Sequence, residues 1–344
     1  MPAPTIATVA ELAGVSTATV SRALQRPDKV QPQTRERVMA AVRATGFVPN
    51  SQARNLRSRA SRTVILLVRD ISNPFYLEIY KGVEEAAVEA GYKVLMGDAR
   101  NDDERIQHYI DMVHARHADG LILMVGRFPE VLKAELGRLP PIVIALETFP
   151  DLSLPFVKID NVAAAAEAVE HLVALGHRRI AHITGPMPET LAVDRLAGYR
   201  RALAAHGLAP DEALVVQGDF GLAAGRAAVR RLFETGTDFT AIFAASDQMA
   251  VGAVSELRAR GLAVPDDISV VGFDDIVLAD AFEPPLTTIH QPRFDIGRQA
   301  MARMIGLLAK EPGGEDVVFA TRLVVRGSTG PVKSDFQLKR RRRP

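Results

Sequence analysis

A chain of 344 residues is long enough for two or three domains, each with its own apolar core. It contains no cysteine, which excludes disulfides, thiolate metal sites and cysteine nucleophiles. The net charge of +1 conceals a segregation: residues 1–62 carry ten basic and three acidic side chains, residues 331–344 carry six and one, and the residues between them have a net charge of −11. A basic end on an acidic body indicates that a polyanion is bound at one end only.

The first residues contain no basic segment followed by an apolar run, and no uncharged apolar stretch is long enough to span a bilayer. We therefore expect a cytoplasmic protein without a signal peptide or a membrane partner.

The stretch 5–24, TIATVAELAGVSTATVSRAL, predicts two short helices joined by a tight turn. Thr5 and Ser16 stand where a side-chain oxygen caps a helix, and Gly14 ends the first helix because glycine adopts the left-handed conformation without a Cβ penalty. The outer face of the second helix carries small residues and one long donor, Arg22, which suits contact with a guanine edge in DNA. The alternative for these twenty residues alone is an ordinary helix pair packed on another element.

A third helix is predicted to begin near Pro32 and to end at Gly46. Three helices in fewer than fifty residues predict a small headpiece. The Thr34 hydroxyl and the side chains of Arg35 and Arg37 are placed for phosphate contacts, which position a protein on DNA but do not specify a sequence.

The segment SQARNLRSR, capped by Asn50, predicts a further helix of about two turns, which is marginal in water on its own. Its arginines surround one apolar residue, Leu56. An apolar side chain among arginines favours a segment that folds against the DNA minor groove and wedges a base step open.

From Thr63 onward, apolar segments alternate with amphipathic ones. The predicted strands span 63–68, 92–97, 120–125, 141–146, 156–160, 179–184, 213–217, 241–245 and 268–273. The predicted helices span 73–91, 103–115, 129–137, 162–175, 191–206, 221–235 and 247–260. Apolar strands separated by helices indicate parallel sheets covered on both faces. We predict two α/β sandwiches in tandem, the second beginning with the strand 156–160, and a ligand cleft at the carboxyl ends of their strands.

Seven segments resemble the lactose-repressor/galactose-repressor (LacI/GalR) family of bacterial transcription regulators: VAELAGVSTATVSRAL, VPNSQARNLRS, GHRRIAHITG, DRLAGYRRAL, ASDQMAVGA, DISVVGFDD and PPLTTIHQP. The resemblance covers nearly the whole chain. The fold that it implies is an all-α helix-turn-helix headpiece with a hinge helix, followed by a two-subdomain parallel α/β sandwich like that of periplasmic binding proteins. The expected domains are the headpiece 1–49, the hinge 50–62, the effector-binding and dimerisation domain 63–330, and a disordered basic tail 331–344.

The resemblance implies a repressor that binds double-stranded operator DNA and is controlled by a small-molecule effector. The DNA-contacting positions that it implies are Thr5, Ser16, Thr17, Ala18, Thr19, Ser21, Arg22, Thr34, Asn50, Ala53 and Leu56. The effector-contacting positions that it implies are Phe75, Arg195, Phe220, Ser246, Asp274 and Gln291. A homodimer is expected rather than a tetramer, because the C-terminus contains no leucine heptad.

The residue chemistry agrees with these roles. Arg195 and Asp274 can each make paired hydrogen bonds to a hydroxylated ring, and Phe220 can stack on a base or sugar. Without the family, Arg195 could equally be a salt-bridged helix residue, Asp274 a cap and Phe220 part of a core. The family often has asparagine where this chain has Ser246, which leaves one fewer hydrogen-bonding group there.

Within the family, the chain is most similar to nucleoside-responsive members through STATVSRAL and PDKV, LPPIVIA, the GDF motif at 218–220, and PPLTTI. This finer resemblance implies a nucleoside effector such as cytidine. The alternatives are a repressor of the same type that responds to a sugar, and a periplasmic-type sugar-binding protein, which the headpiece disfavours. No P-loop, nucleophile elbow or HExxH motif is present, so we expect no enzyme, no cofactor and no metal site.

Overall fold

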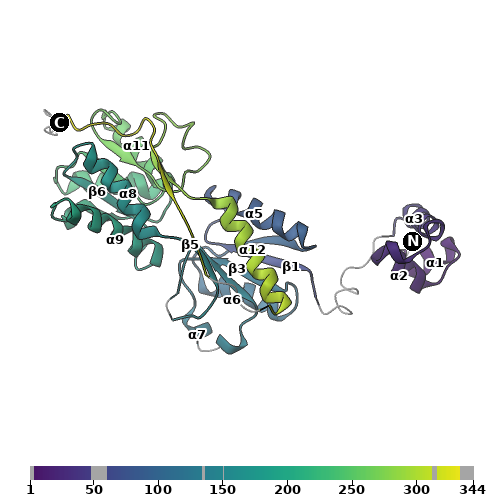
Figure 1. The fold of residues 1–344 in the computed structure, drawn as a ribbon. Coiled ribbons are helices and arrows are strands. Elements are labelled where there is room, and N and C mark those ends of the chain that lie inside the picture. The colour runs from purple at the N-terminus through teal and green to yellow at the C-terminus, as the bar shows by residue number, and fades with distance from the viewer. Residues whose placement is uncertain (1–3, 48–59, 134–135, 150, 312–315, 334–344) are drawn as a thin grey trace. The chain divides into compact units, whose positions relative to one another are not determined.

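The computed structural model describes residues 4–47, 60–133, 136–149, 151–311 and 316–333. The chain divides into two units, Met1–Ser61 and Arg62–Pro344 (Figure 1). The first unit is helical and the second is built on parallel sheets, which confirms the expected fold class. Within the described residues, no helix has the length and apolar character needed to cross a membrane.

Three helices form the headpiece: α1 (Ile6–Ala13), α2 (Thr17–Gln25) and α3 (Pro32–Thr45), with a 3₁₀ turn η1 (Pro27–Lys29) before α3. The Thr5 hydroxyl accepts a hydrogen bond from the Thr8 amide at 3.3 Å, and the Ser16 hydroxyl accepts one from the Thr19 amide at 3.2 Å. Gly14 ends α1 with a φ of 61°. The predicted helix caps and the predicted turn are therefore confirmed.

The headpiece core is small and consists of valines and alanines. Its buried members are Val9, Ala10, Ala13, Val20, Ala23, Val38 and Ala41. Arg37, which is predicted to contact a DNA phosphate, donates to the carbonyl oxygens of Ala13 and Gly14. A helix end leaves carbonyl groups without partners, and the guanidinium satisfies two of them.

The first sandwich is a six-stranded parallel sheet in the order β11-β5-β4-β3-β1-β2. The strands are β1 (Thr63–Val68), β2 (Lys93–Asp98), β3 (Gly120–Met124), β4 (Ile142–Ala145), β5 (Phe156–Ile159) and β11 (Val317–Phe319). Helices α5 (Phe75–Glu89) and α12 (Arg293–Ala309) cover one face, and α6 (Asp103–His114) and α7 (Glu130–Lys133) cover the other (Figure 1). Alternate residues of each strand point to opposite helical layers. Because helices cover both faces of the sheet, the residues on both faces are apolar.

The second sandwich is a four-stranded parallel sheet in the order β7-β6-β8-β9. Its strands are β6 (Ile180–Thr184), β7 (Val215–Gln217), β8 (Ala241–Ala244) and β9 (Ser269–Val271). Helices α8 (Asn161–Ala174) and α9 (Thr190–Ala205) pack on one face, and α10 (Leu222–Glu234) and α11 (Asp247–Ala259) pack on the other. A short antiparallel pair, β10 (Thr288–His290) and β12 (Arg322–Val324), lies against α8.

The prediction that the two sandwiches follow one another along the chain is wrong. The strand predicted to open the second sandwich is β5, which pairs with β4 and β11 in the first sheet. After β10 the chain returns to the first sandwich to form α12 and β11, and then leaves it again for β12. Three chain segments therefore connect the sandwiches, at 160–161, 291–292 and 320–321.

Helix α12 is absent from the sequence prediction because its start carries no capping side chain and its interior contains two glycines. One of these glycines has a packing role. A Cβ atom added to Gly297 would lie 2.1 Å from the Ile79 carbonyl oxygen, and one added to Gly82 of α5 would lie 2.0 Å from the Phe294 carbonyl oxygen. Glycine at both positions allows the backbones of α5 and α12 to touch.

Gly297→Ala is therefore expected to lower the free energy of unfolding by about 1–3 kcal/mol, because the added methyl group must displace backbone atoms. Gly306→Ala on the same helix is the matched control: its nearest neighbour would be a Glu311 carboxylate oxygen 3.6 Å away. That control should raise stability by about 0.5–1 kcal/mol, because alanine is the better helix former. Urea unfolding measures both, and equal effects of the two variants would contradict the close helix crossing.

Candidate functional site

The outer face of α2 is available for contact. Thr17, Ala18 and Arg22 are exposed, and Thr19 and Ser21 are half-buried, whereas Val20 and Ala23 on the opposite face are buried. The Ser16 hydroxyl lies 2.9 Å from the Thr19 hydroxyl, so these two side chains hold each other at the start of the helix. The structure thus presents the small polar surface with one long donor that the sequence predicts.

The remaining DNA-contacting predictions divide into two groups. Thr5 is exposed and its hydroxyl lies 3.1 Å from that of Thr8 in a capping box, and Thr34 is half-buried on the first turn of α3. Asn50, Ala53 and Leu56 lie outside the described residues.

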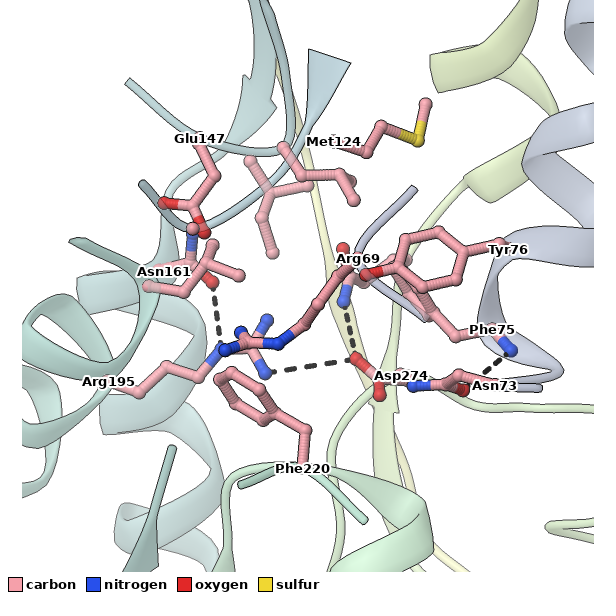
Figure 2. A pocket seen from close by; sticks show the side chains of 15 residues that line it. Arg69, Asn73, Phe75, Tyr76, Met124, Glu147, Asn161, Arg195, Phe220 and Asp274 are labelled. Carbon is pink, nitrogen blue, oxygen red and sulfur yellow. Dashed lines mark hydrogen bonds and ion pairs between the residues drawn. The ribbon is translucent and has the colours of Figure 1, made fainter. Parts of the chain in front are cut away.

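A cavity that is partly open to solvent lies between the two sandwiches (Figure 2). It opens at the carboxyl ends of β1, β3, β4 and β5, where side chains of the first sandwich meet those of the second. The lining residues are Arg69, Asn73, Phe75, Tyr76, Met124, Gly126, Leu146, Glu147, Ile159, Asn161, Leu191, Arg195, Phe220, Asp274 and Gln291. The predicted cleft is therefore present, and it combines an apolar wall with several charged groups.

Five of the six predicted effector contacts line this cavity: Phe75, Arg195, Phe220, Asp274 and Gln291. The sixth, Ser246, does not. Its hydroxyl donates to the Phe220 carbonyl oxygen at 3.0 Å and accepts from the Met249 amide at 3.2 Å, so it caps α11. A serine at a helix start satisfies a free amide of the first turn, and this occupies the group that a ligand would need.

Arg195 is held rigidly at the cavity wall. It is 4% exposed, its Nε donates to the Asn161 Oδ1 at 3.0 Å, and its guanidinium carbon lies 3.7 Å from the centre of the Phe273 ring. Its Nη1 is 3.8 Å from the Asp274 Oδ1 (Figure 2). Burial lowers the pKa of Arg195, and the Asp274 carboxylate opposes that shift most strongly. A cation fixed in this way can direct its remaining donors at a ligand.

Asp274 faces Arg195 across the cavity. Its Oδ1 accepts a hydrogen bond from the Gln291 Nε2 at 2.8 Å. Burial raises the pKa of Asp274 to about 6, against the opposing effect of Arg195. Burial also raises the pKa of the neighbouring Asp247, whose Oδ1 accepts from the Thr288 hydroxyl at 2.6 Å. Asp274 is thus an acceptor whose charge depends on the cation beside it.

Three cavity residues have a backbone conformation that side chains other than glycine rarely adopt. The φ angles are 75° at Leu146, 71° at Phe220 and 118° at Asp274. Such residues cost about 1–3 kcal/mol each and persist where the surrounding structure enforces them, often at binding sites. Their convergence on one cavity supports a ligand-binding role for it.

Two polar contacts cross the cavity mouth and were not anticipated from the sequence. The Arg69 guanidinium, just after β1, forms a two-pronged ion pair with the Glu189 carboxylate, which precedes α9 in the other sandwich. The Gln248 amide donates to the Asn73 Oδ1 at 3.1 Å. Both side chains of the ion pair are only about one-tenth exposed, at 11% and 10%. These contacts exist only while the two sandwiches are close together.

Glu189→Gln is expected to weaken effector binding about five- to thirtyfold, because losing the charged partner of Arg69 costs the closed arrangement about 1–2 kcal/mol. Asp103→Asn is the matched control: it breaks the Arg127–Asp103 pair, which lies within the first sandwich and is about half exposed, at 52% and 42%. Calorimetric titration of the effector measures both variants. Equal affinities for Glu189→Gln and the unmodified protein would show that the ion pair does not stabilise closure.

A helix-turn-helix unit followed by two sandwiches around a ligand cavity defines a ligand-controlled DNA-binding protein. Comparison with known families agrees. Residues 5–50 match the model of bacterial regulatory proteins of the lacI family, and residues 169–329 match the periplasmic binding protein-like domain. The chain belongs to the LacI family of bacterial transcription regulators.

Relatives of known function align over almost the full length. The chain is 43% identical to the HTH-type transcriptional repressor CytR of Escherichia coli (strain K12), over 95% of this chain and 96% of the relative. It is 39% identical to the HTH-type transcriptional regulator CelR of Thermobifida fusca, over 94% and 98%. These relatives are transcription regulators, and the chain is a DNA-binding repressor with a ligand-binding domain rather than an enzyme.

Solved structures give the same result. The lac repressor dimer bound to operator and the anti-inducer ONPF superposes with a TM-score of 0.82 at 28% identity, covering 95% of this chain and 99% of that one. A complex of the transcriptional regulator CelR with cellobiose superposes with a TM-score of 0.73 at 36% identity, covering 94% and 99%.

Proposed function

We propose that the effector of this repressor is a nucleoside, with cytidine as the first candidate, and that it binds in the cavity between the sandwiches. The carrying observation is the buried Arg195–Asp274 pair beside the Phe220 ring, with the Arg195 guanidinium carbon 5.7 Å from the ring centre. Arg195 and Asp274 hold ribose hydroxyls, because a fixed donor and a fixed acceptor suit a vicinal diol. Phe220 and Phe75 provide flat apolar contact for the base.

The 43% identity to a repressor named CytR supports the nucleoside. The second candidate effector is a sugar, which the resemblance to the CelR–cellobiose complex favours. A nucleoside and a sugar would each use the paired hydroxyl contacts of this fold. The two candidates differ in which part of the ligand faces the aromatic wall. Ser246 is left out of the proposed contacts, because its hydroxyl caps α11.

Operator DNA is bound by a homodimer in this proposal. Two copies of the chain occupy a near-palindromic site, one headpiece to each half-site, with α2 in the major groove. Arg22 contacts a base edge with Thr17 and Ala18 beside it, while Arg35 contacts the backbone. The excess of basic side chains in residues 1–62 makes affinity fall steeply with salt through counterion release.

Effector binding closes the cavity and shifts the first sandwich, which is joined to the headpiece through residues 50–62. In this proposal Leu56 of each chain enters an opened minor-groove step at the operator centre, with Asn50 and Ala53 beside it. Closure separates the two hinge segments and specific affinity drops, while electrostatic binding to any DNA persists. The effector thus acts as an inducer.

Isothermal titration calorimetry of the full-length protein with cytidine, uridine, adenosine and a hexose tests the effector. Heat with cytidine, and release of a fluorescent operator duplex at the same concentrations, is the expected result. Clear binding of a hexose with no heat from any nucleoside would replace the nucleoside by a sugar and leave the DNA-binding assignment intact.

A further inference from the structure

The Glu147 carboxyl group accepts a backbone hydrogen bond from Leu191, but this contact leaves one of its two oxygens unused in the cavity wall. Glu147 follows β4, lines the cavity and is 3% exposed (Figure 2). Its Oε2 is buried and has no hydrogen-bond partner among the residues that the structure describes. A buried carboxyl oxygen without a partner costs free energy, so its retention at a cavity wall indicates a group that meets a ligand.

The charges around Glu147 disfavour an ionised carboxylate. The acidic Glu189, which precedes α9, is close enough to interact electrostatically with Glu147, and so is Tyr76 on α5. The two cations nearby, Arg69 after β1 and Arg195 on α9, are engaged by Glu189 and by Asn161 and Asp274 respectively. Burial and Glu189 raise the pKa of Glu147 to about 8, although both arginines and the backbone hydrogen bond from Leu191 oppose the shift.

A neutral carboxyl group differs from a carboxylate in what it can recognise. It offers one O–H donor next to one carbonyl acceptor, whereas a carboxylate only accepts. Its complement is a ring edge on which one acceptor adjoins one donor, such as a bare ring nitrogen beside an exocyclic amino group or a carbonyl oxygen beside a ring N–H. Cytosine carries this pair at N3 and N4, and adenine at N1 and N6. The corresponding edge of guanine carries two adjacent donors and favours a carboxylate instead.

We propose that Glu147 recognises the effector's base as a neutral carboxyl group, donating to a ring nitrogen and accepting from the adjacent amino group. This inference rests on the proposed nucleoside effector and assigns to Glu147 the edge of the base on which an acceptor adjoins a donor, which for cytidine is N3 and N4. The bound base supplies the partner that the buried Oε2 lacks among the described residues.

The first test is the pH dependence of cytidine affinity, measured by calorimetry from pH 7 to 9.5. Because the protonated carboxyl binds, affinity is expected to be constant up to about pH 8 and then to fall about tenfold per pH unit. Glu147→Gln, whose amide keeps one donor and one acceptor, should bind with affinity independent of pH in this range. Asp274 does not interfere, because it titrates near pH 6, below the window.

The second test compares cytidine with its analogue that lacks the 4-amino group, the ribonucleoside of pyrimidin-2-one. The unmodified protein should bind the analogue about tenfold more weakly, and Glu147→Leu should bind both equally, since the contact that distinguishes them is gone. Thermal unfolding of both variants verifies the fold. An affinity for cytidine that rises with pH, or a tenfold preference that persists in Glu147→Leu, would overturn the inference alone. Absence of binding by every nucleoside to the unmodified protein would overturn the proposed effector and this inference together.

Discussion

Replacing Asp274 with asparagine is expected to abolish the effector response and to leave operator binding unchanged. The carboxylate is the charged acceptor opposite Arg195, 3.8 Å from its Nη1, and asparagine presents a neutral amide to both the cation and the ligand hydroxyls. Losing charge-assisted hydrogen bonds of this kind costs about 3 kcal/mol, or roughly 150-fold in affinity. Calorimetry with the effector and operator binding at fixed salt measure the two functions separately.

Stability provides the control for this variant. The pKa of Asp274 is raised to about 6 in the folded protein, so its contribution to stability is largest below the unfolded pKa and is lost as the pH rises through 6. Asparagine has no such loss. The melting temperature of Asp274→Asn should therefore equal or exceed that of the unmodified protein at pH 8, and the difference should shrink toward pH 4. Lost effector binding with a lower melting temperature at pH 8 would indicate damage to the fold instead.

The second large effect concerns the headpiece. Arg22→Ala should cost about 1–3 kcal/mol on the best operator and relax the preference at one base pair, because a base-edge contact carries sequence information. Arg22 is exposed on the outer face of α2, where its side chain contributes nothing to the core. Competition between operator variants in a binding assay measures the loss at each base pair.

Arg35→Ala on α3 is the matched variant for Arg22→Ala. Arg35 is also exposed. Its replacement by alanine should weaken binding to all DNA sequences alike and reduce the salt dependence of binding by about one counterion. If both variants lost affinity equally for all DNA sequences, Arg22 would be shown to contact a phosphate and not a base edge. Arg37→Ala is not a suitable third variant, because this side chain binds two carbonyl oxygens at the end of α1.

Local sequence signals predicted most of the elements because their causes are local. Thr5, Gly14 and Ser16 act within one helical turn of their own position, so the headpiece helices were predicted to within one residue. The predicted helix 129–137 shows the limit. Among the described residues of this segment, Glu130–Lys133 is α-helical and Leu136–Arg138 is a 3₁₀ turn. The connection between sandwiches was missed because β11 pairs with β5 across more than 150 residues, and no local pattern records such a pairing.

The candidate site shows the same division. Residues in distinctive motifs, such as Arg195 in RLAGY and Asp274 in GFDD, were anticipated through the family. Glu147 and Asn161 each follow a predicted strand, so the rule that ligands meet strand carboxyl ends was a usable signal for them. Glu189 had no such signal, because only the packing of the two sandwiches brings it to Arg69. Ser246 lies outside the cavity lining and its hydroxyl caps α11, so its predicted ligand contact stays a prediction.

The return of the chain to the first sandwich has a consequence for how the protein is made. Val64, Leu66 and Val68 of β1 emerge early from the ribosome, yet α12, which helps to cover their face of the sheet, begins at residue 293. The headpiece can fold as it is synthesised, whereas the first sheet stays incomplete until its edge strand β11 is added at residue 317. Nascent chains of this length that expose apolar strands are prone to aggregate. Premature termination after β10 would therefore yield an insoluble fragment rather than a working half-domain.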